Sequence, residues 1–164
     1  MDTRMDENAL ALEQFGVGHP VLRVEDPKLL KGEGRYTDDV NVAGQAHGFI
    51  VRSRYAHGTI RKVDVSAARK MPGVLGAYSA ADLAAAGVNP IKCGMMVQGR
   101  DGKPWLTPPR PVLAAEKVRF SGEAVAMVVA ETLAQAKDAA EAVVVEIDPL
   151  PAAPNVEAAL AAGA

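Results

Sequence analysis

The residues of this chain that could do chemistry include three histidines, His19, His47 and His57. They are not spaced as helical metal ligands four residues apart, and no carboxylate motif accompanies them. Their spacing therefore argues against a metal site. We expect His57, which ends the stretch Arg-Ser-Arg-Tyr-Ala-His, to hold a turn by hydrogen bonding.

Glycine pairs are a second candidate, for a nucleotide site. Such a site needs a strand before the glycines and a helix after them, because the helix N-terminus binds the pyrophosphate. Gly16-Val-Gly18 and Gly32-Glu-Gly34 lack a third glycine at the right spacing and follow no predicted strand, and Gly94 is isolated. We interpret these glycines as turn residues that supply positive φ angles.

Sulfur-containing and acidic side chains are further candidates for chemistry. Cys93 has no base beside it, although the charge of Lys92 would favour its thiolate, and a lone cysteine is more often a small buried hydrophobe. Asp38 and Asp39 lack the spacing of a calcium loop and indicate a solvated loop.

Two methionines and one glutamate also have structural interpretations. Met95 and Met96 are expected to pack or to lie in an interface rather than to bind metal. Glu123 is the carboxylate most expected to be partly buried, and a salt bridge with Arg119 outweighs a role as catalytic base. We therefore name no catalytic, cofactor-binding or metal-binding residue in this sequence.

The bulk composition is that of an ordinary globular chain. Of the 164 residues, 49% are hydrophobic, 23% charged and 4% aromatic, so Ala, Val and Leu must fill the core. The formal net charge of −2 gives no reason to expect nucleic acid or a membrane as a partner. One cysteine excludes an internal disulfide, and the acidic first sixteen residues lack an apolar signal segment. We expect a cytoplasmic protein.

The elements that must position these residues centre on residues 124–130. This apolar run predicts a strand buried on both faces. Thr132 and Gln135 form a capping box that opens a helix, and a second strand, 143–147, follows in a βαβ-like unit. We expect Leu133 and Ala136 to face a core made by Val125, Met127, Val129, Val143 and Val145.

Further elements are predicted on either side of this unit. Strands are expected at 46–52, 59–65 and 73–78. Helical turns are expected after Asp26, which caps a turn that Gly32 ends, over 80–86, and over 156–160 with Asn155 as the cap. The sum is an α+β fold, with a mixed sheet of about five or six strands and two or three short helices. We expect residues 1–18 to form a flexible arm, residues 19–150 to form the domain and residues 151–164 to form a linker.

Residues 88–111 form a long loop with five prolines and the only tryptophan, Trp105. Loops of this length are usually functional or bind partners. We expect this loop and the N-terminal arm to be the least ordered parts of the isolated chain, and to become protected when partners are present.

A series of motifs resembles a known family. The motifs occur in the same order as in that family and cover about residues 20–160; they are Arg23–Asp39, Val51–His57, Met71–Val74, Lys117–Ala126, Ala130–Glu141 and Asp148–Pro151. They resemble the N-terminal α/β-hammerhead domain of the molybdenum-binding large subunit of xanthine dehydrogenases, aldehyde oxidases and carbon monoxide dehydrogenases.

This resemblance implies a cofactor arrangement that the chain does not itself contain. The complete subunit of the family carries molybdenum–molybdopterin, and iron–sulfur clusters and FAD belong to partner subunits. The cofactor-binding region lies beyond the linker 151–164 in the family, so no catalytic residue transfers to this chain, which we do not expect to be active alone.

Two classes of function remain open. The first is a hammerhead scaffold or short subunit of such an oxidoreductase, contacting the cofactor-binding part and the partner subunits. The alternative is a stand-alone interaction or ligand-binding module that uses loop 88–111. The ordered motifs favour the first.

Overall fold

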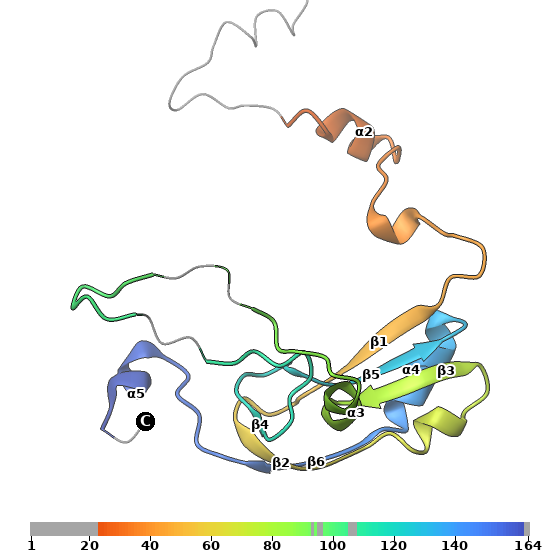
Figure 1. Ribbon diagram of the computed structural model, residues 1–164. Helices are drawn as coiled ribbons and strands as arrows, with labels where there is room; N and C mark the ends of the chain where they lie inside the picture. The colour runs from red at the N-terminus through yellow and green to blue at the C-terminus, as the bar shows by residue number, and fades with distance from the viewer. Residues whose placement is uncertain (1–22, 93, 95–96, 105–107, 163–164) are drawn as a thin grey trace, which may run out of the picture. The chain divides into compact units, whose positions relative to one another are not determined.

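The computed structural model describes residues 23–92, 94, 97–104 and 108–162 (Figure 1). The chain divides into two compact units, Met1–Ala43 and Gly44–Ala164. All the named strands belong to the second unit.

The described part of the first unit has two short helices, α2 (Asp26–Leu30) and η1 (Thr37–Asp39). Gly32, with φ of +72°, ends α2 as predicted, and Glu33 N–H donates to Lys28 O at 2.9 Å. The prediction that Asp26 caps the helix is wrong, because Asp26 is the first helical residue and pairs with Arg23 at 3.2 Å. No residue of either helix is buried.

The second unit contains two three-stranded sheets, in which every strand pair is antiparallel. The first sheet has the order β1 (His47–Arg52), β5 (Ala124–Ala130), β3 (Val74–Ser79). The second has the order β4 (Lys117–Val118), β2 (Gly58–Asp64), β6 (Val144–Pro149). The α+β class and the six strands are confirmed, and the strands form two sheets rather than one.

The central strand β5 carries the main core. Ala126, Val128 and Ala130 are fully buried, as the unbroken apolar run predicted. Helix α4 (Leu133–Glu141) packs against β5 and β1 through the buried side of Ala136, Ala139 and Ala140. Small alanine side chains let the helix approach the sheet closely, so the core contains few large residues.

Part of the predicted core is wrong. Leu133, expected to face the core, is 44% exposed: it is the first residue of α4, and the buried residues of this helix begin at Ala136, which does face the core. Only Val125 of the five predicted core residues is fully buried. The other four are half-buried, namely Met127, Val129, Val143 and Val145.

A second cluster joins the two sheets. It consists of buried Ala114, Val118 and Val125, with half-buried apolar residues around it, namely Val51, Ile60, Val145 and Ile147. These residues come from both sheets. The predicted βαβ-like unit therefore differs from the structure: β5 and β6 lie in different sheets, and α4 connects one sheet to the other.

Local capping signals are confirmed where the sequence placed them. Thr132 N–H donates to Gln135 Oε1 at 3.0 Å and Gln135 N–H donates to Thr132 Oγ1 at 3.2 Å. Asn155 Oδ1 accepts from Ala158 N–H at 2.8 Å at the start of α5 (Val156–Leu160). The remaining helices are η2 (Ala68–Lys70) and α3 (Ala80–Ala85).

Candidate functional site

The candidate residues of the sequence take structural roles wherever the structure describes them. His57 Nδ1 lies 2.7 Å from Pro151 O, and Leu150 N–H donates to His57 O at 2.9 Å. His57 therefore forms hydrogen bonds as expected, but they join the start of β2 to the residues that follow β6 rather than hold a turn. His47 begins β1 opposite Ala130.

Several candidates lie outside the described residues, namely Gly16, Gly18, His19, Cys93, Met95, Met96, Trp105 and Leu106. Of the described ones, Gly34 and Gly94 do not have positive φ, whereas Gly32 does. Asp38 and Asp39 form η1, where Asp39 Oδ2 accepts from Tyr36 N–H at 2.8 Å.

Within the part of the chain that the structure describes, no three His, Cys, Asp or Glu side chains lie close enough together to hold a metal ion. The described donor set does not fit a metal centre, and we assign no chemical step to one.

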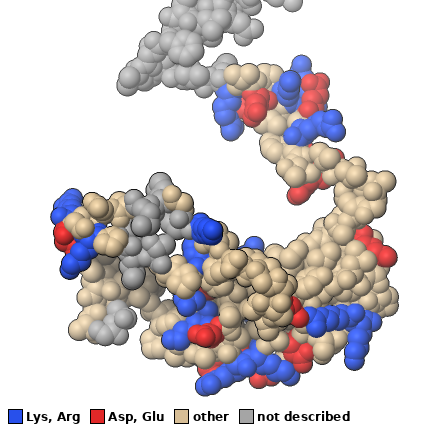
Figure 2. Space-filling view, in the orientation of Figure 1, with Lys and Arg blue, Asp and Glu red and all other residues tan. Residues whose placement is uncertain are grey.

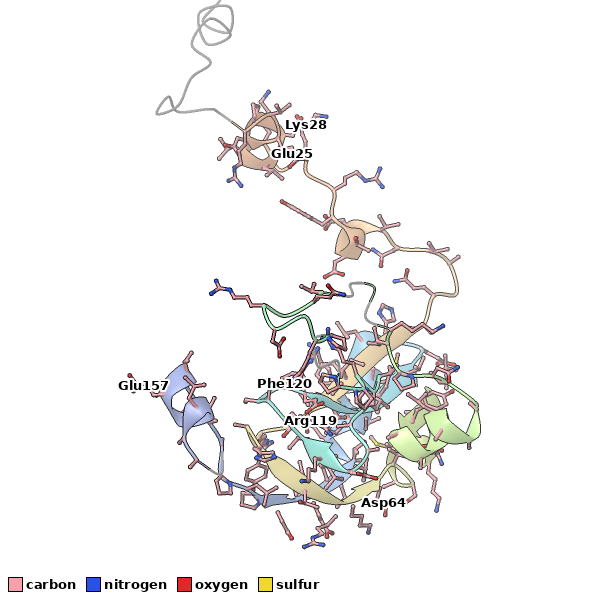
Figure 3. The ribbon with its side chains drawn as sticks, turned by 60° about the vertical axis from the view of Figure 1, so that its left-hand side comes forward. Glu25, Lys28, Asp64, Arg119, Phe120 and Glu157 are labelled. Atoms are coloured by element: carbon pink, nitrogen blue, oxygen red, sulfur yellow. The ribbon has the colours of Figure 1, made fainter. Side chains whose placement is uncertain are left out.

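Glu123 closes a turn rather than an ion pair. Its Oε2 accepts from the backbone N–H of Arg119 at 2.5 Å, whereas the Arg119 guanidinium donates to Lys117 O at 3.3 Å. The predicted salt bridge between these two side chains is therefore wrong. Gly122, with φ of +85°, shapes the turn, and Glu123 O accepts from Ser53 N–H at 2.8 Å. Figure 3 shows Arg119 beside exposed Phe120 after β4.

The carboxylate of Asp82 joins three elements, η2, β3 and α3, and we call this group of contacts the Asp82 clasp. Its Oδ2 accepts from the Ser79 hydroxyl and the Ser79 N–H, each at 2.7 Å, and its Oδ1 pairs with Arg69 Nη2 at 2.5 Å. Arg69 Nε also donates to Ala77 O at 2.8 Å. The Ser79 hydrogen bonds and then the Arg69 bond lower the pKa of Asp82 to about 2.

Asp64 has a similar local environment at the end of β2 (Figure 3). Hydrogen bonds from Ser66, followed by that from Lys62, lower its pKa to about 2. Ser66 N–H lies 2.9 Å from Asp64 Oδ1, and Lys62 Nζ lies 3.2 Å from Oδ2. Neither Asp64 nor Asp82 lines the groove described next, so both shifts report local structure.

A groove of about 860 Å³ runs beside β1, and we call it the β1 groove. Eight consecutive residues of β1 and the following turn line it, 48–55. The other lining residues come from α4 and the segment after it, namely Lys137, Ala140, Glu141, Val143, Val145 and Ile147. Its lining is mixed: the valines and isoleucines are half-buried, and the charged side chains are exposed.

We call the exposed charged residues of the lining the rim of the β1 groove, and they are mainly cationic. Arg52, Arg54 and Lys137 are all exposed, and Glu141 is the single carboxylate among the lining residues. Arg52 Nη1 donates to Gly122 O at 2.8 Å, which fixes its side chain. No ion pair is present at Arg54 or Lys137 within the described ranges.

The turn after β1 is held by two hydrogen bonds of Ser53. Buried Ser53 donates its hydroxyl to Tyr55 O at 2.8 Å, and its Oγ accepts from Tyr55 N–H at 3.0 Å. Sequence reasoning missed this groove. The signal was the run Arg-Ser-Arg-Tyr that begins at the last residue of a predicted strand, but the sequence does not show that this strand lies at a sheet edge.

The rest of the surface shows no concentration of one charge on the face in view. Figure 2 shows acidic and basic groups side by side on the second unit, with broad uncharged areas between them. Large apolar side chains are exposed near both ends of the described chain, namely Val24, Leu30, Val156 and Leu160. Among the described residues, no helix is long and apolar enough to cross a bilayer.

Comparison with known proteins gives a consistent result. The family model described as "Aldehyde oxidase and xanthine dehydrogenase, a/b hammerhead domain" matches residues 31–151. The chain is 41% identical over 135 residues to the nicotine 6-hydroxylase large subunit of Paenarthrobacter nicotinovorans. It is 40% identical over 137 residues to the carbon monoxide dehydrogenase large chain of Afipia carboxidovorans.

Those two matches cover 82% and 83% of this chain but 16% of each relative. Among solved structures, quinoline 2-oxidoreductase from Pseudomonas putida 86 matches with a TM-score of 0.72 and 40% identity, over 87% of this chain and 17% of that one. A Cu,Mo-CO dehydrogenase matches with a TM-score of 0.62 and 38% identity, over 83% of this chain and 16% of that one.

The resemblance predicted from the ordered motifs is thereby confirmed, and the chain spans about one sixth of the length of these relatives. The chain belongs to the aldehyde oxidase and xanthine dehydrogenase family and contains its a/b hammerhead domain.

Proposed function

We propose that this chain is the hammerhead scaffold of a molybdopterin-dependent hydroxylase or dehydrogenase, and that it contacts the cofactor-binding part of the large subunit. The carrying observation is the family match over residues 31–151, combined with relatives named as large subunits of such enzymes. One relative is named as a xanthine dehydrogenase molybdenum-binding subunit.

The chemistry of the described residues supports a scaffold rather than a catalyst. The carboxylates of Glu123, Asp82 and Asp64 each accept local hydrogen bonds that stabilise turns or strand ends. The exposed apolar side chains near both ends of the described residues favour contact with further protein. The role of this chain is to present a folded surface, and molybdenum chemistry takes place in the cofactor-binding part.

The proposed organisation follows from this role. Residues 19–150 form the hammerhead domain, preceded by an arm, 1–18, and followed by a linker, 151–164, that leads to the cofactor-binding part. Iron–sulfur and FAD subunits complete the enzyme. The relatives named as a large subunit and as "subunit gamma" of a dehydrogenase complex support a multi-subunit assembly.

A stand-alone module that uses loop 88–111 is the second candidate. In the described part of this loop, Ile91 N–H donates to Arg110 O at 2.8 Å, and Gln98 and Pro104 form an isolated antiparallel β-bridge. These contacts bring the two sides of the loop together. Ile91 and Val97 are exposed on it. A module of this kind would bind a partner without molybdenum or flavin in the assembly.

Purification from the native host separates the two candidates. Protein purified through an affinity tag on the chromosomal gene should contain molybdenum together with this sequence. It should also show the absorbance of flavin and of iron–sulfur clusters. The 164-residue chain produced alone should carry none of them. Recovery from the host without molybdenum or flavin would overturn the scaffold proposal, and stoichiometric molybdenum in the chain produced alone would overturn the placement of the cofactor.

A further inference from the structure

Among the described strands, β1 has one edge that pairs with no other strand. It pairs with β5 on one side, and it is the terminal strand in the sheet order β1-β5-β3. No strand among the described residues pairs with its other side. An edge of this kind presents a row of backbone N–H and C=O groups that can template another strand.

The β1 groove follows this unpaired edge. Consecutive side chains of a strand point to opposite faces of a sheet, yet all of residues 48–55 line the groove. The groove therefore runs along the edge of β1 rather than over one of its faces. Val143, Val145 and Ile147, which alternate along the chain, supply one face of a second wall. This shape fits an extended segment better than a compact ligand.

The chemistry of the groove selects the kind of segment. The valine and isoleucine wall favours apolar side chains, whereas Arg52, Arg54 and Lys137 against one carboxylate, Glu141, favour acidic ones. A second copy of this chain is disfavoured, because two copies meeting along β1 would bring their cationic rims together. The complementary segment carries apolar residues and carboxylates in alternation.

We propose that the cofactor-binding part of the large subunit adds an extended, acidic and apolar segment to the free edge of β1 as a fourth strand. Main-chain hydrogen bonds supply the affinity, and the groove selects the side chains. This inference rests on the proposed function and states how the scaffold is joined to the rest of the subunit.

Amide hydrogen exchange is the first test. The isolated 164-residue chain is compared with the assembled, molybdenum-containing protein from the native host. Because a new strand pairs the free edge, amides within 47–55 should exchange at least roughly tenfold more slowly in the assembly. Unchanged exchange over 47–55 in an assembly that contains molybdenum overturns the inference and leaves the proposed function standing.

Photo-crosslinking identifies the occupant. Benzoylphenylalanine in place of Tyr55, which is 45% exposed and lines the groove, should crosslink to one peptide of the cofactor-binding part that alternates apolar and acidic residues. The same substitution at Tyr78, which is 41% exposed on β3, is the matched control and should not capture that peptide. Capture of a second copy, or of an iron–sulfur or flavin subunit, from position 55 overturns the inference.

Charge reversal tests the rim. Arg54→Glu with Lys137→Glu should reduce the protection of residues 47–55 in the assembly by roughly tenfold at low salt. Lys70→Glu reverses an exposed charge outside the groove and should leave that protection unchanged. Equal effects of the groove and control variants would show that the cationic rim does not select the segment.

Discussion

The two sheets of the second unit are stabilised in different ways. In the first sheet, four of the seven residues of the central strand β5 are buried, and helix α4 covers the sheet. In the second sheet, only Gly58 of the seven residues of the central strand β2 is buried, and Arg61 and Lys62 are exposed. The first sheet therefore holds most of the buried apolar residues of the two sheets. The second sheet contributes apolar residues mainly to the cluster around Val118 and Val125 that joins the two sheets.

The polar contacts of the second sheet do not compensate for its thinner core. Arg61 pairs with Asp148 at 2.5 Å and Lys62 with Asp64 at 3.2 Å, but all four side chains are a third or more exposed. Ion pairs in such positions contribute about 0–1 kcal/mol each. The second sheet therefore depends on close backbone approach between its strands and on the cluster around Val118 and Val125.

The largest expected effect is in the first sheet. Val128→Asp would bury an unpaired carboxylate in a fully buried position and should lower the free energy of unfolding by roughly 3–5 kcal/mol. Val144→Asp makes the same change on β6, where the side chain is 47% exposed. It should cost only roughly 1 kcal/mol, mainly because Asp64 lies opposite position 144 on β2. Urea unfolding followed by circular dichroism measures both. Val129→Asp, at a half-buried position, should fall between them.

Equal unfolding free energies for the Val128 and Val144 variants would contradict the comparison. They would show that the second sheet contributes as much buried apolar contact as the first.

The next effect is at the close approach within the second sheet. A Cβ added at Gly58 would lie 2.8 Å from Asp148 O and would also meet the side chain of Ile147. Gly58→Ala should therefore force β2 and β6 apart and cost roughly 1–3 kcal/mol. Gly44→Ala is a control for backbone strain alone, because Gly44 has φ of +75° and nothing within 4 Å of the added atom.

The Gly44 variant should cost about 1 kcal/mol and leave the spectrum of the second sheet unchanged. Two-dimensional NMR of the amides of β2 and β6 distinguishes the two cases. Undisturbed β2 and β6 amides in Gly58→Ala would show that the strands accommodate the extra atom.

The contrast between the sheets also explains which features the sequence could predict. Caps and turns depend on neighbouring residues, so Thr132 with Gln135, Asn155 and Gly32 were located correctly. The apolar run 124–130 is a strand with the predicted bounds. These signals lie within a few residues of one another, and elementary physical chemistry is sufficient to interpret them.

Features that depend on distant pairing were not predictable in this way. β5 pairs with β1, some seventy residues earlier, and with β3 on its other side. The division into two sheets, the exposure of Leu133 and the free edge of β1 all follow from that pairing. The β1 groove, built from three elements, therefore had no local signal beyond its arginines. The expected low order of residues 1–18 and of loop 88–111 stays a prediction.

The smallest expected effect is the acid response of the Asp82 clasp. The pKa of Asp82 is lowered from its ordinary value of 3.8 to about 2, so below pH 4 the unfolded chain binds a proton that the folded chain does not. The stabilisation from this carboxylate is therefore fully present above about pH 4 and is lost as the pH falls towards 2. Asp82→Asn should flatten the decline of the urea midpoint between pH 4 and pH 2.

The parent's remaining slope in the same window has a second source, because the pKa of Asp64 is also lowered to about 2. Asp138→Asn is the matched control: it removes an exposed carboxylate of α4 that forms no ion pair within the described ranges, and it should leave the pH slope unchanged. If Asp82→Asn retains the full parental slope, the contacts from Ser79 and Arg69 do not stabilise the charged form. The acid response would then arise elsewhere, and the clasp between η2, β3 and α3 would be held by packing alone.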